Sequence, residues 1–164
     1  MSLNESVHFM SGETDLIKLY SGRILALAAD IPHSERLKSA DASVKKRSPL
    51  CGSIVTVDLD ITDGRVSAFG QDVKACALGQ ASASVVGGAL IGCTPAQAFK
   101  ARDQLRALLK GSGEIPDAPF DGFEVFLPAS TYKNRHASIL LSIEATCEAI
   151  DIIYAKEKNA AHPV

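Results

Sequence analysis

Residues 51–73, CGSIVTVDLDITDGRVSAFGQDV, decide the fold that this sequence predicts. Apolar and polar side chains alternate along the first half, as in a half-buried strand, with Val55, Val57, Leu59 and Ile61 on one side and Thr56, Asp58 and Asp60 on the other. Asp63-Gly64 is a typical hairpin turn, and residues 65–73 predict the returning strand. The stretch therefore predicts an antiparallel hairpin whose open end brings Cys51 close to Cys76.

Two further elements are predicted on the amino-terminal side of the hairpin. Residues 42–48 predict a short edge strand that ends at Pro49, with one face formed by Ala42, Val44, Lys46 and Ser48. Between Glu13 and Asp30, apolar residues recur at steps of three and four, which is the pattern of an amphipathic helix. These residues are Leu16, Ile17, Tyr20, Ile24, Leu27 and Ala28.

Three helices and a short extended piece are predicted after the hairpin. The small residues from 78 to 92 are compatible with a helix that lies close to a sheet. Thr94, Pro95 and Gln97 form the pattern of a capped helix start, and Gly111 is placed to end that helix. FEVFL, residues 123–127, predicts the extended piece after a loop. The last helix has one apolar stripe, which consists of His136, Leu140, Ile143, Cys147, Ile150 and Tyr154.

Length and composition indicate one globular domain. The chain has 164 residues, and we expect a single domain over 1–164 with its core at about 13–157 and flexible tails at 1–12 and 158–164. A net charge of −2 argues against nucleic acid as a partner. The apolar runs fall short of the ~20 residues that cross a membrane, and the first residues lack the pattern of a secretory signal, so we expect a cytoplasmic protein. The four cysteines have irregular spacing, so we expect reduced thiols.

Three ligand-capable side chains are predicted to converge: Cys51 before one strand, Cys76 before a helix, and His136 at the head of the last helix. A thiol at a helix N-terminus lies at the positive end of the helix dipole, which stabilises the thiolate as a nucleophile and metal ligand. The small residues after Cys76 have two interpretations: they let an inorganic group or a partner's loop approach the sulfur, or they permit tight packing between helix and sheet. We expect Cys93 and Cys147 to be small buried residues.

The sequence resembles the iron–sulfur cluster assembly scaffolds, the family of IscU, SufU and the amino-terminal domain of NifU, over residues 15–155. The matching motifs are CGSIVTVDLDITDGRV at 51–66, KACALGQASAS at 74–84 and, more weakly, RHASILLSIEA at 135–145. Two positions depart from the family pattern. Ser53 replaces the aspartate of the family's Cys-Gly-Asp word, and the third family cysteine is replaced by His136, or by Ala137 beside a retained histidine.

The resemblance implies an α+β fold with an N-terminal helix, a small antiparallel three-stranded sheet, and helices packed on one face. It implies a scaffold or carrier rather than an enzyme. The scaffold would hold iron or a [2Fe-2S] cluster through Cys51, Cys76 and His136. A cysteine desulfurase would supply sulfur, with Cys76 or Cys51 as the persulfide acceptor, and apo iron–sulfur proteins would receive the product from a monomer or weak dimer. The fourth ligand stays open between Asp72, Lys74, a partner's side chain and water.

Two alternatives remain at this point. One is a zinc-binding accessory protein of the SufU type with a role in sulfur transfer, because zinc accepts mixed cysteine and histidine ligands. The other is a degenerate interaction domain that binds no metal.

Overall fold

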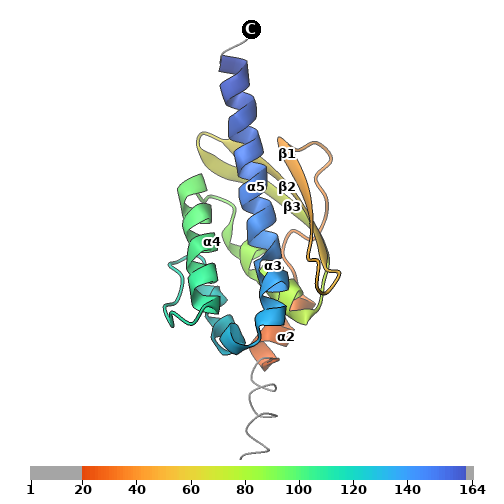
Figure 1. Cartoon of the computed structure of the whole chain (residues 1–164). Helices are drawn as coiled ribbons and strands as arrows, with labels where there is room; N and C mark the ends of the chain where they lie inside the picture. The colour runs from red at the N-terminus through yellow and green to blue at the C-terminus, as the bar shows by residue number, and fades with distance from the viewer. Residues whose placement is uncertain (1–19, 162–164) are drawn as a thin grey trace, which may run out of the picture.

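The computed structural model describes residues 20–161. Its elements form a three-stranded sheet with helices on one face (Figure 1). In chain order they are α2 (Gly22–Ala29), β1 (Ala42–Arg47), β2 (Ile54–Thr62), β3 (Arg65–Lys74), α3 (Ala77–Ala89), α4 (Pro95–Leu109), the 3₁₀ helices η1 (Asp121–Thr131) and η2 (Lys133–Arg135), and α5 (His136–Ala161). The predicted α+β fold is confirmed. In the described part of the chain, no helix is both long enough and apolar enough to span a bilayer.

The sheet is antiparallel with the order β1-β2-β3. The predicted hairpin is confirmed: its turn places Asp63 at φ 53° and Gly64 at φ 74°, the left-handed conformation that a tight hairpin turn requires. The open end of the hairpin pairs Ile54 with Lys74. The segments that immediately precede β2 and follow β3 therefore lie at the same end of the sheet.

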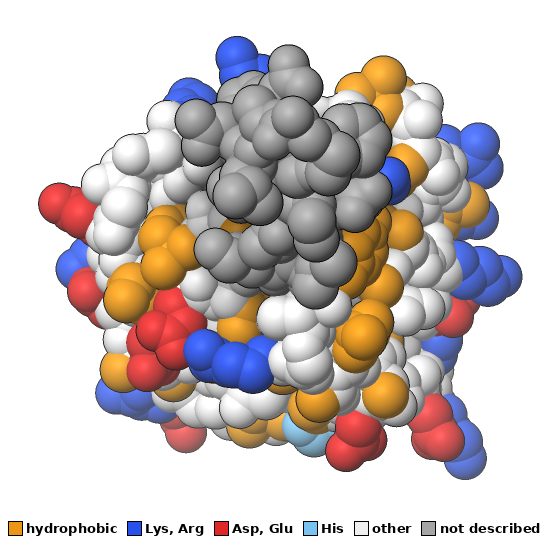
Figure 2. Space-filling model, turned by 90° about the horizontal axis from the view of Figure 1, so that it is seen from below, with side chains coloured by type: hydrophobic (Ala, Val, Ile, Leu, Met, Phe, Trp, Pro, Cys, Tyr) orange, Lys and Arg blue, Asp and Glu red, His pale blue; other side chains and the backbone are white. Residues whose placement is uncertain are grey.

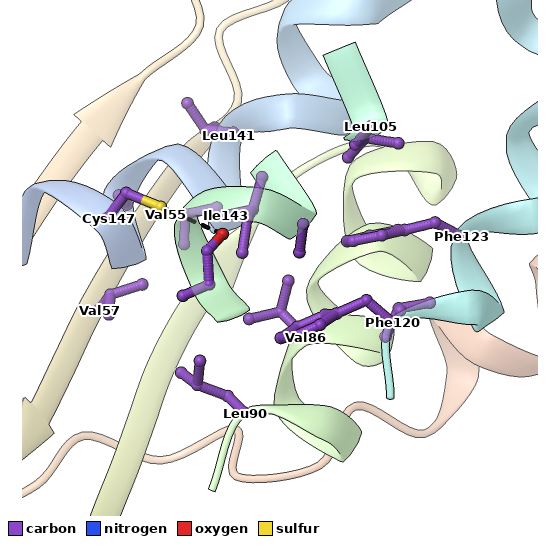
Figure 3. Packing of buried hydrophobic residues seen from close by; sticks show 14 of the residues in the cluster. Val55, Val57, Val86, Leu90, Leu105, Phe120, Phe123, Leu141, Ile143 and Cys147 are labelled. Atoms are coloured by element: carbon purple, nitrogen blue, oxygen red, sulfur yellow. Dashed lines mark hydrogen bonds between the residues drawn. The ribbon is translucent and has the colours of Figure 1, made fainter. Parts of the chain in front are cut away.

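Helix α5 lies between the sheet and the other helices (Figure 1). It contacts β1 and β2 on one side and α3 and α4 on the other. The predicted single apolar stripe was too narrow, because Ile139, Leu141 and Ala145 are buried as well. At the far end, Tyr154 is 41% exposed. Figure 3 shows the resulting core, in which Val55 and Val57 of the sheet, Val86 of α3 and Leu105 of α4 surround Ile143.

The predicted extended piece at 123–127 was wrong, because these residues lie in the 3₁₀ helix η1. Phe120, Phe123 and Phe126 are spaced by three residues, the period of a 3₁₀ helix, and all three are buried. Their successive ring centroids are 6.1 Å and 6.3 Å apart. The segment therefore adds an aromatic row to the core rather than a strand to the sheet.

The amino-terminal helix is confirmed only over its second half. It begins at Gly22, where the Ser21 hydroxyl accepts a hydrogen bond from the Ile24 amide at 3.4 Å. Ile24 is fully buried, whereas Leu27 and Ala28 are partly buried against the core. The predicted helical residues 13–19 and the predicted tail at 1–12 lie outside the described residues, as do residues 162–164 of the predicted tail at 158–164. Residues 158–161 of that tail lie in α5.

The outer face of the sheet is covered at Asp58, which the strand pattern had placed on the solvent side. The Asp58 carboxylate is buried and accepts hydrogen bonds from Arg36 Nε at 2.6 Å and Arg36 Nη2 at 3.1 Å. It also accepts from the Leu37 amide at 3.0 Å and from the Ser43 hydroxyl. A Cβ at Gly70 would collide with the Glu35 carbonyl oxygen. The segment before β1 thus crosses the sheet closely and seals Asp58 beneath it.

Gln71 of β3 connects the sheet to two helices. Its side chain is fully buried; Nε2 donates to the Ala83 carbonyl of α3 at 2.8 Å, and Oε1 accepts from the Ser142 hydroxyl of α5 at 3.0 Å. The backbone amide of Gln71 donates to the His33 carbonyl at 2.9 Å. Both ends of the buried amide side chain are therefore satisfied, as a polar group in a core requires.

Candidate functional site

Cys51 and Cys76 lie at the open end of the β2-β3 hairpin, as the sequence predicts. Cys51 lies in the β1–β2 loop, which is closed by hydrogen bonds from the Ser48 amide to the Ser53 carbonyl at 2.8 Å and from the Gly52 amide to the Ser48 carbonyl at 3.1 Å. Gly52 has φ +70°, a conformation that favours glycine. Cys76 is the N-cap residue of α3. The Cys51 side chain is exposed, and that of Cys76 is half-buried.

Two buried serine hydroxyls connect the two thiols. Cys51 Sγ lies 3.1 Å from Ser53 Oγ, which lies 3.1 Å from Ser138 Oγ, and Ser138 Oγ lies 3.4 Å from Cys76 Sγ. Ser53 is 3% exposed and Ser138 is 1% exposed. The loop before β2, the start of α3 and the first turn of α5 therefore meet at one hydrogen-bonded group of two sulfurs and two oxygens.

The hydroxyls around Cys51 favour its thiolate. Partial burial raises the pKa of the Cys51 thiol, but hydrogen bonds with the Ser48, Ser53 and Ser138 hydroxyls and with the Ser53 backbone more than offset that effect and lower the pKa to about 7. A pKa near 7 means that a large fraction of Cys51 is the nucleophilic form at neutral pH. Cys147 is the opposite case, because burial raises its pKa to about 12.

We expect this difference to appear in alkylation rates. The rate at which iodoacetamide modifies Cys51 should rise with pH, with a midpoint near pH 7. Cys147, which is 1% exposed, should react only after unfolding. Quantitative mass spectrometry of the two cysteine peptides across pH 5.5 to 9.5 measures both. Ser53→Ala should move the Cys51 midpoint upward, because it removes a hydrogen bond to the thiolate. A native midpoint near 9.0, the value of an unperturbed thiol, would contradict this expectation.

The small residues after Cys76 allow α3 to pack closely against α5. A Cβ at Gly79 would lie 2.6 Å from Ser138 Oγ and 2.8 Å from Ala75 Cβ. The Ser82 hydroxyl donates to the Ile139 carbonyl of α5 at 2.5 Å, a contact that a larger side chain would prevent. The packing interpretation of these residues is therefore confirmed, and close packing also places Ser138 beside Cys76.

Gly79→Ala should destabilise the protein and disturb the site. Alanine favours a helix by about 0.8–1.0 kcal/mol over glycine, but overpacking costs about 1–3 kcal/mol, so we expect a net loss of about 1 kcal/mol in the free energy of unfolding. Urea unfolding measures the loss. Gly88→Ala is the matched control on the same helix, because the nearest atom to a Cβ there, Pro32 Cγ, lies 3.9 Å away. Equal or greater stability of Gly79→Ala would contradict the packing argument.

His136, the predicted third ligand, is the first residue of α5 and is half-buried. Its Nε2 is hydrogen-bonded to the Ala129 carbonyl oxygen at 2.8 Å. Within residues 20–161, no three His, Cys, Asp or Glu side chains are grouped so that they could hold one metal ion. Ligation by His136 therefore stays a prediction.

The remaining predicted residues have clear positions. Asp72 and Lys74, candidates for a fourth ligand, line a polar hollow of about 390 Å³ on the sheet together with Arg36, Lys45 and Thr56. Their part in ligation stays a prediction. Cys93 and Cys147 are buried, as predicted, at 3% and 1% exposure.

Sequence reasoning missed Ser138. The sequence motif pointed to His136 and Ala137 at this point of the chain. No sequence signal marks Ser138, because its burial on α5 is known only from the structure.

A second hollow, of about 560 Å³, lies between α2, α3 and η1. It borders the second half of α3, from Ser84 to Ala89, whereas Cys76 caps the start of that helix. Figure 2 shows the lower end of the molecule, where hydrophobic side chains are visible in several places and charged side chains of both signs lie mostly toward the rim. The hollow is therefore separate from the thiol pair.

Comparison with known proteins identifies relatives of this fold. No protein-family model and no curated protein sequence matches the chain. Among solved structures, the amino-terminal part of a nitrogen-fixing NifU-like protein from Brucella abortus is 41% identical, covers 87% of this chain and 99% of its own, and superposes with a TM-score of 0.84.

Two more distant structures share the fold. A hypothetical protein is 20% identical, with a TM-score of 0.73, and covers 82% of this chain and 98% of its own. A protein from Fervidobacterium islandicum, described as an iron–sulfur cluster assembly scaffold of the SUF system, is also 20% identical, with a TM-score of 0.70 and the same coverage.

The fold and the paired thiols thus define a domain of the iron–sulfur scaffold class. The chain belongs to the family of IscU, SufU and the amino-terminal domain of NifU.

Proposed function

We propose that this protein is a scaffold or carrier in iron–sulfur cluster assembly. It accepts sulfur from a cysteine desulfurase, holds iron and sulfide at Cys51 and Cys76, and passes the product to apo-proteins. The observation that carries this proposal is the thiol pair joined through Ser53 and Ser138, with one exposed thiol and one at a helix N-terminus. The NifU-like relative supports the scaffold role.

Cys51 is the better placed sulfur acceptor of the two, because it is exposed and its pKa is about 7. Its thiolate would attack the outer sulfur of the desulfurase persulfide. A sulfur–sulfur bond then forms at Cys51 as the corresponding bond in the desulfurase breaks, and the desulfurase cysteine leaves as a thiolate. No oxidant or reductant is consumed in this exchange. Reduction of the Cys51 persulfide to the sulfide of a cluster takes two further electrons, which an external thiol reductant such as dithiothreitol supplies.

The donor set suits cargo that must be released. A [2Fe-2S] cluster usually has four thiolate ligands, whereas this site provides two thiols and neutral oxygens. Fewer thiolates mean a weaker hold on iron, which a carrier needs in order to transfer its load. In this proposal the protein is itself the carrier of the cargo.

Anaerobic reconstitution tests the proposal. The full chain is incubated with a cysteine desulfurase, cysteine, dithiothreitol and ferrous iron, then separated from small molecules and mixed with an apo-ferredoxin. We expect a brown protein that contains iron and sulfide and that converts the apo-ferredoxin to its holo form. A colourless product, whether it contains zinc or no metal, would contradict the proposal.

Omission of iron and of dithiothreitol, which would reduce a persulfide, from the same incubation tests sulfur transfer separately. The intact protein should gain the mass of one sulfur atom, and peptide analysis should place it on Cys51. A modification confined to Cys76 would assign the acceptor role to that residue instead.

A further inference from the structure

Ser138 occupies the centre of the thiol site. Its oxygen lies 3.4 Å from Cys76 Sγ and 3.1 Å from Ser53 Oγ, which in turn contacts Cys51 Sγ. The residue is 1% exposed and comes from α5, a third element beside those that carry the two cysteines. A side chain from α5 is therefore one of the hydrogen-bonding groups that contact the two cysteines.

The Ser138 hydroxyl bonds outside its own helix, as those of Ser82 and Ser142 do. A hydroxyl in a helix can also bond to the carbonyl four residues earlier, as Thr146 does with the Ser142 carbonyl at 2.8 Å. The Ser138 hydroxyl instead contacts Ser53 and Cys76, and Gly79 provides the space that this position requires.

We propose that Ser138 Oγ, rather than the imidazole of His136, is the third protein donor to the metal held by Cys51 and Cys76. His136 Nε2 is already engaged by the Ala129 carbonyl, and the histidine takes no part in the hydrogen bonds that join the sulfurs. A hydroxyl oxygen holds a borderline-soft metal less tightly than a thiolate does, so this position weakens the site without removing a donor. This inference rests on the part of the proposed function that places a metal at Cys51 and Cys76, but not on the identity of the cargo.

A titration with Co²⁺ alone tests the donor set on the full chain, because thiolate-to-cobalt charge-transfer absorbance grows with the number of thiolate ligands. Ser138→Cys should raise this absorbance per bound ion by about half, from two thiolates to three, and should tighten binding at least ~10-fold. Ser138→Ala should weaken binding several-fold, whereas His136→Ala should leave both quantities unchanged. Ser82→Ala is the matched control, because Ser82 also joins α3 to α5 but bonds only to the Ile139 carbonyl.

A measurement without metal checks the geometry. Mild oxidation of Ser138→Cys with diamide should join the new thiol to Cys76, and peptide mass spectrometry would detect the disulfide. Circular dichroism and urea unfolding establish that each variant folds.

Three results would overturn the inference. The first is that the charge-transfer absorbance per bound ion does not rise in Ser138→Cys but does rise in Ala137→Cys or His136→Cys. The second is loss of binding in His136→Ala, and the third is absence of Co²⁺ binding by both the unchanged protein and Ser138→Cys. If the cobalt results hold but reconstitution gives no cluster, the proposed function fails and the donor assignment stands.

Discussion

The substitution Cys51→Ser or Cys76→Ser is expected to lower the affinity of the protein for iron–sulfur cargo by more than about 100-fold. Loss of a residue that only supports a ligand typically costs about 10- to 100-fold in metal affinity, and loss of a thiolate ligand removes a direct bond. With two cysteines at the site, each substitution leaves a single thiolate. Reconstitution followed by visible absorbance and iron analysis measures the effect, and we expect the variants to be colourless.

Cys93→Ala is the matched control for these variants. Cys93 is 3% exposed, and its thiol bonds to the Ala89 carbonyl at 3.1 Å, with no contact to either site sulfur. This variant should be somewhat less stable but should retain the full cluster content. Wild-type cluster content in both Cys51→Ser and Cys76→Ser would refute the site.

Asp58→Ala is expected to reduce the free energy of unfolding by about 3 kcal/mol. The change removes the partner of Arg36 and leaves the Leu37 amide and the Ser43 hydroxyl without their acceptor. Loss of one partner of a buried ion pair costs about 3–5 kcal/mol, and we expect the lower end because Arg36 is 53% exposed and can be hydrated. Chemical unfolding at pH 7 measures the loss.

The pH dependence gives a second measure of the same interaction. Burial raises the pKa of Asp58, but hydrogen bonds from Arg36, Ser43 and the Leu37 amide outweigh it, so the pKa lies below the usual 3.8. Because the folded-state pKa is lowered, the stabilisation is complete above the unfolded pKa and disappears as the pH falls through the folded one.

The stability difference between wild type and Asp58→Ala should therefore shrink below about pH 4. Asp72, an exposed carboxylate on β3, provides the control. The substitution Asp72→Asn should change the free energy of unfolding by less than about 0.5 kcal/mol at any pH. A difference that stays constant down to pH 2 would show that Asp58 does not stabilise through its charge.

The elements with strong local signals were predictable. The strand β2, the Asp63-Gly64 turn, and the capping box of Thr94 and Gln97 each depend on residues close in sequence, and the structure confirms all three, although β2 is buried on both faces at Thr56 and Asp58 rather than on one. The register of the hairpin then determines that Cys51 and Cys76 lie at one end of the sheet. Half of the candidate site was therefore accessible from local patterns.

The rest depends on contacts between distant segments. Asp58 looks like a solvent-facing strand residue until Arg36, 22 positions earlier, is seen to cross the sheet. Ser138 lies 85 positions from Ser53 and 62 from Cys76, and serine is too common for its type to indicate a site. The piece at 123–127, with Phe123 and Phe126, was wrongly predicted as extended, because a short aromatic run fits a strand or a 3₁₀ helix equally well until the core is known.

The buried amide of Gln71 links parts of the molecule that would otherwise open separately. Its side chain bonds to α3 and to α5, and its backbone bonds to the segment before β1. Any fluctuation that lifts α3 from the sheet must leave a buried amide unsatisfied, which costs about 1–3 kcal/mol. The backbone amide protons of β3, α3 and α5 should accordingly exchange with solvent as one cooperative unit. The proposed cargo could then leave Cys51 and Cys76 without local unfolding of these elements.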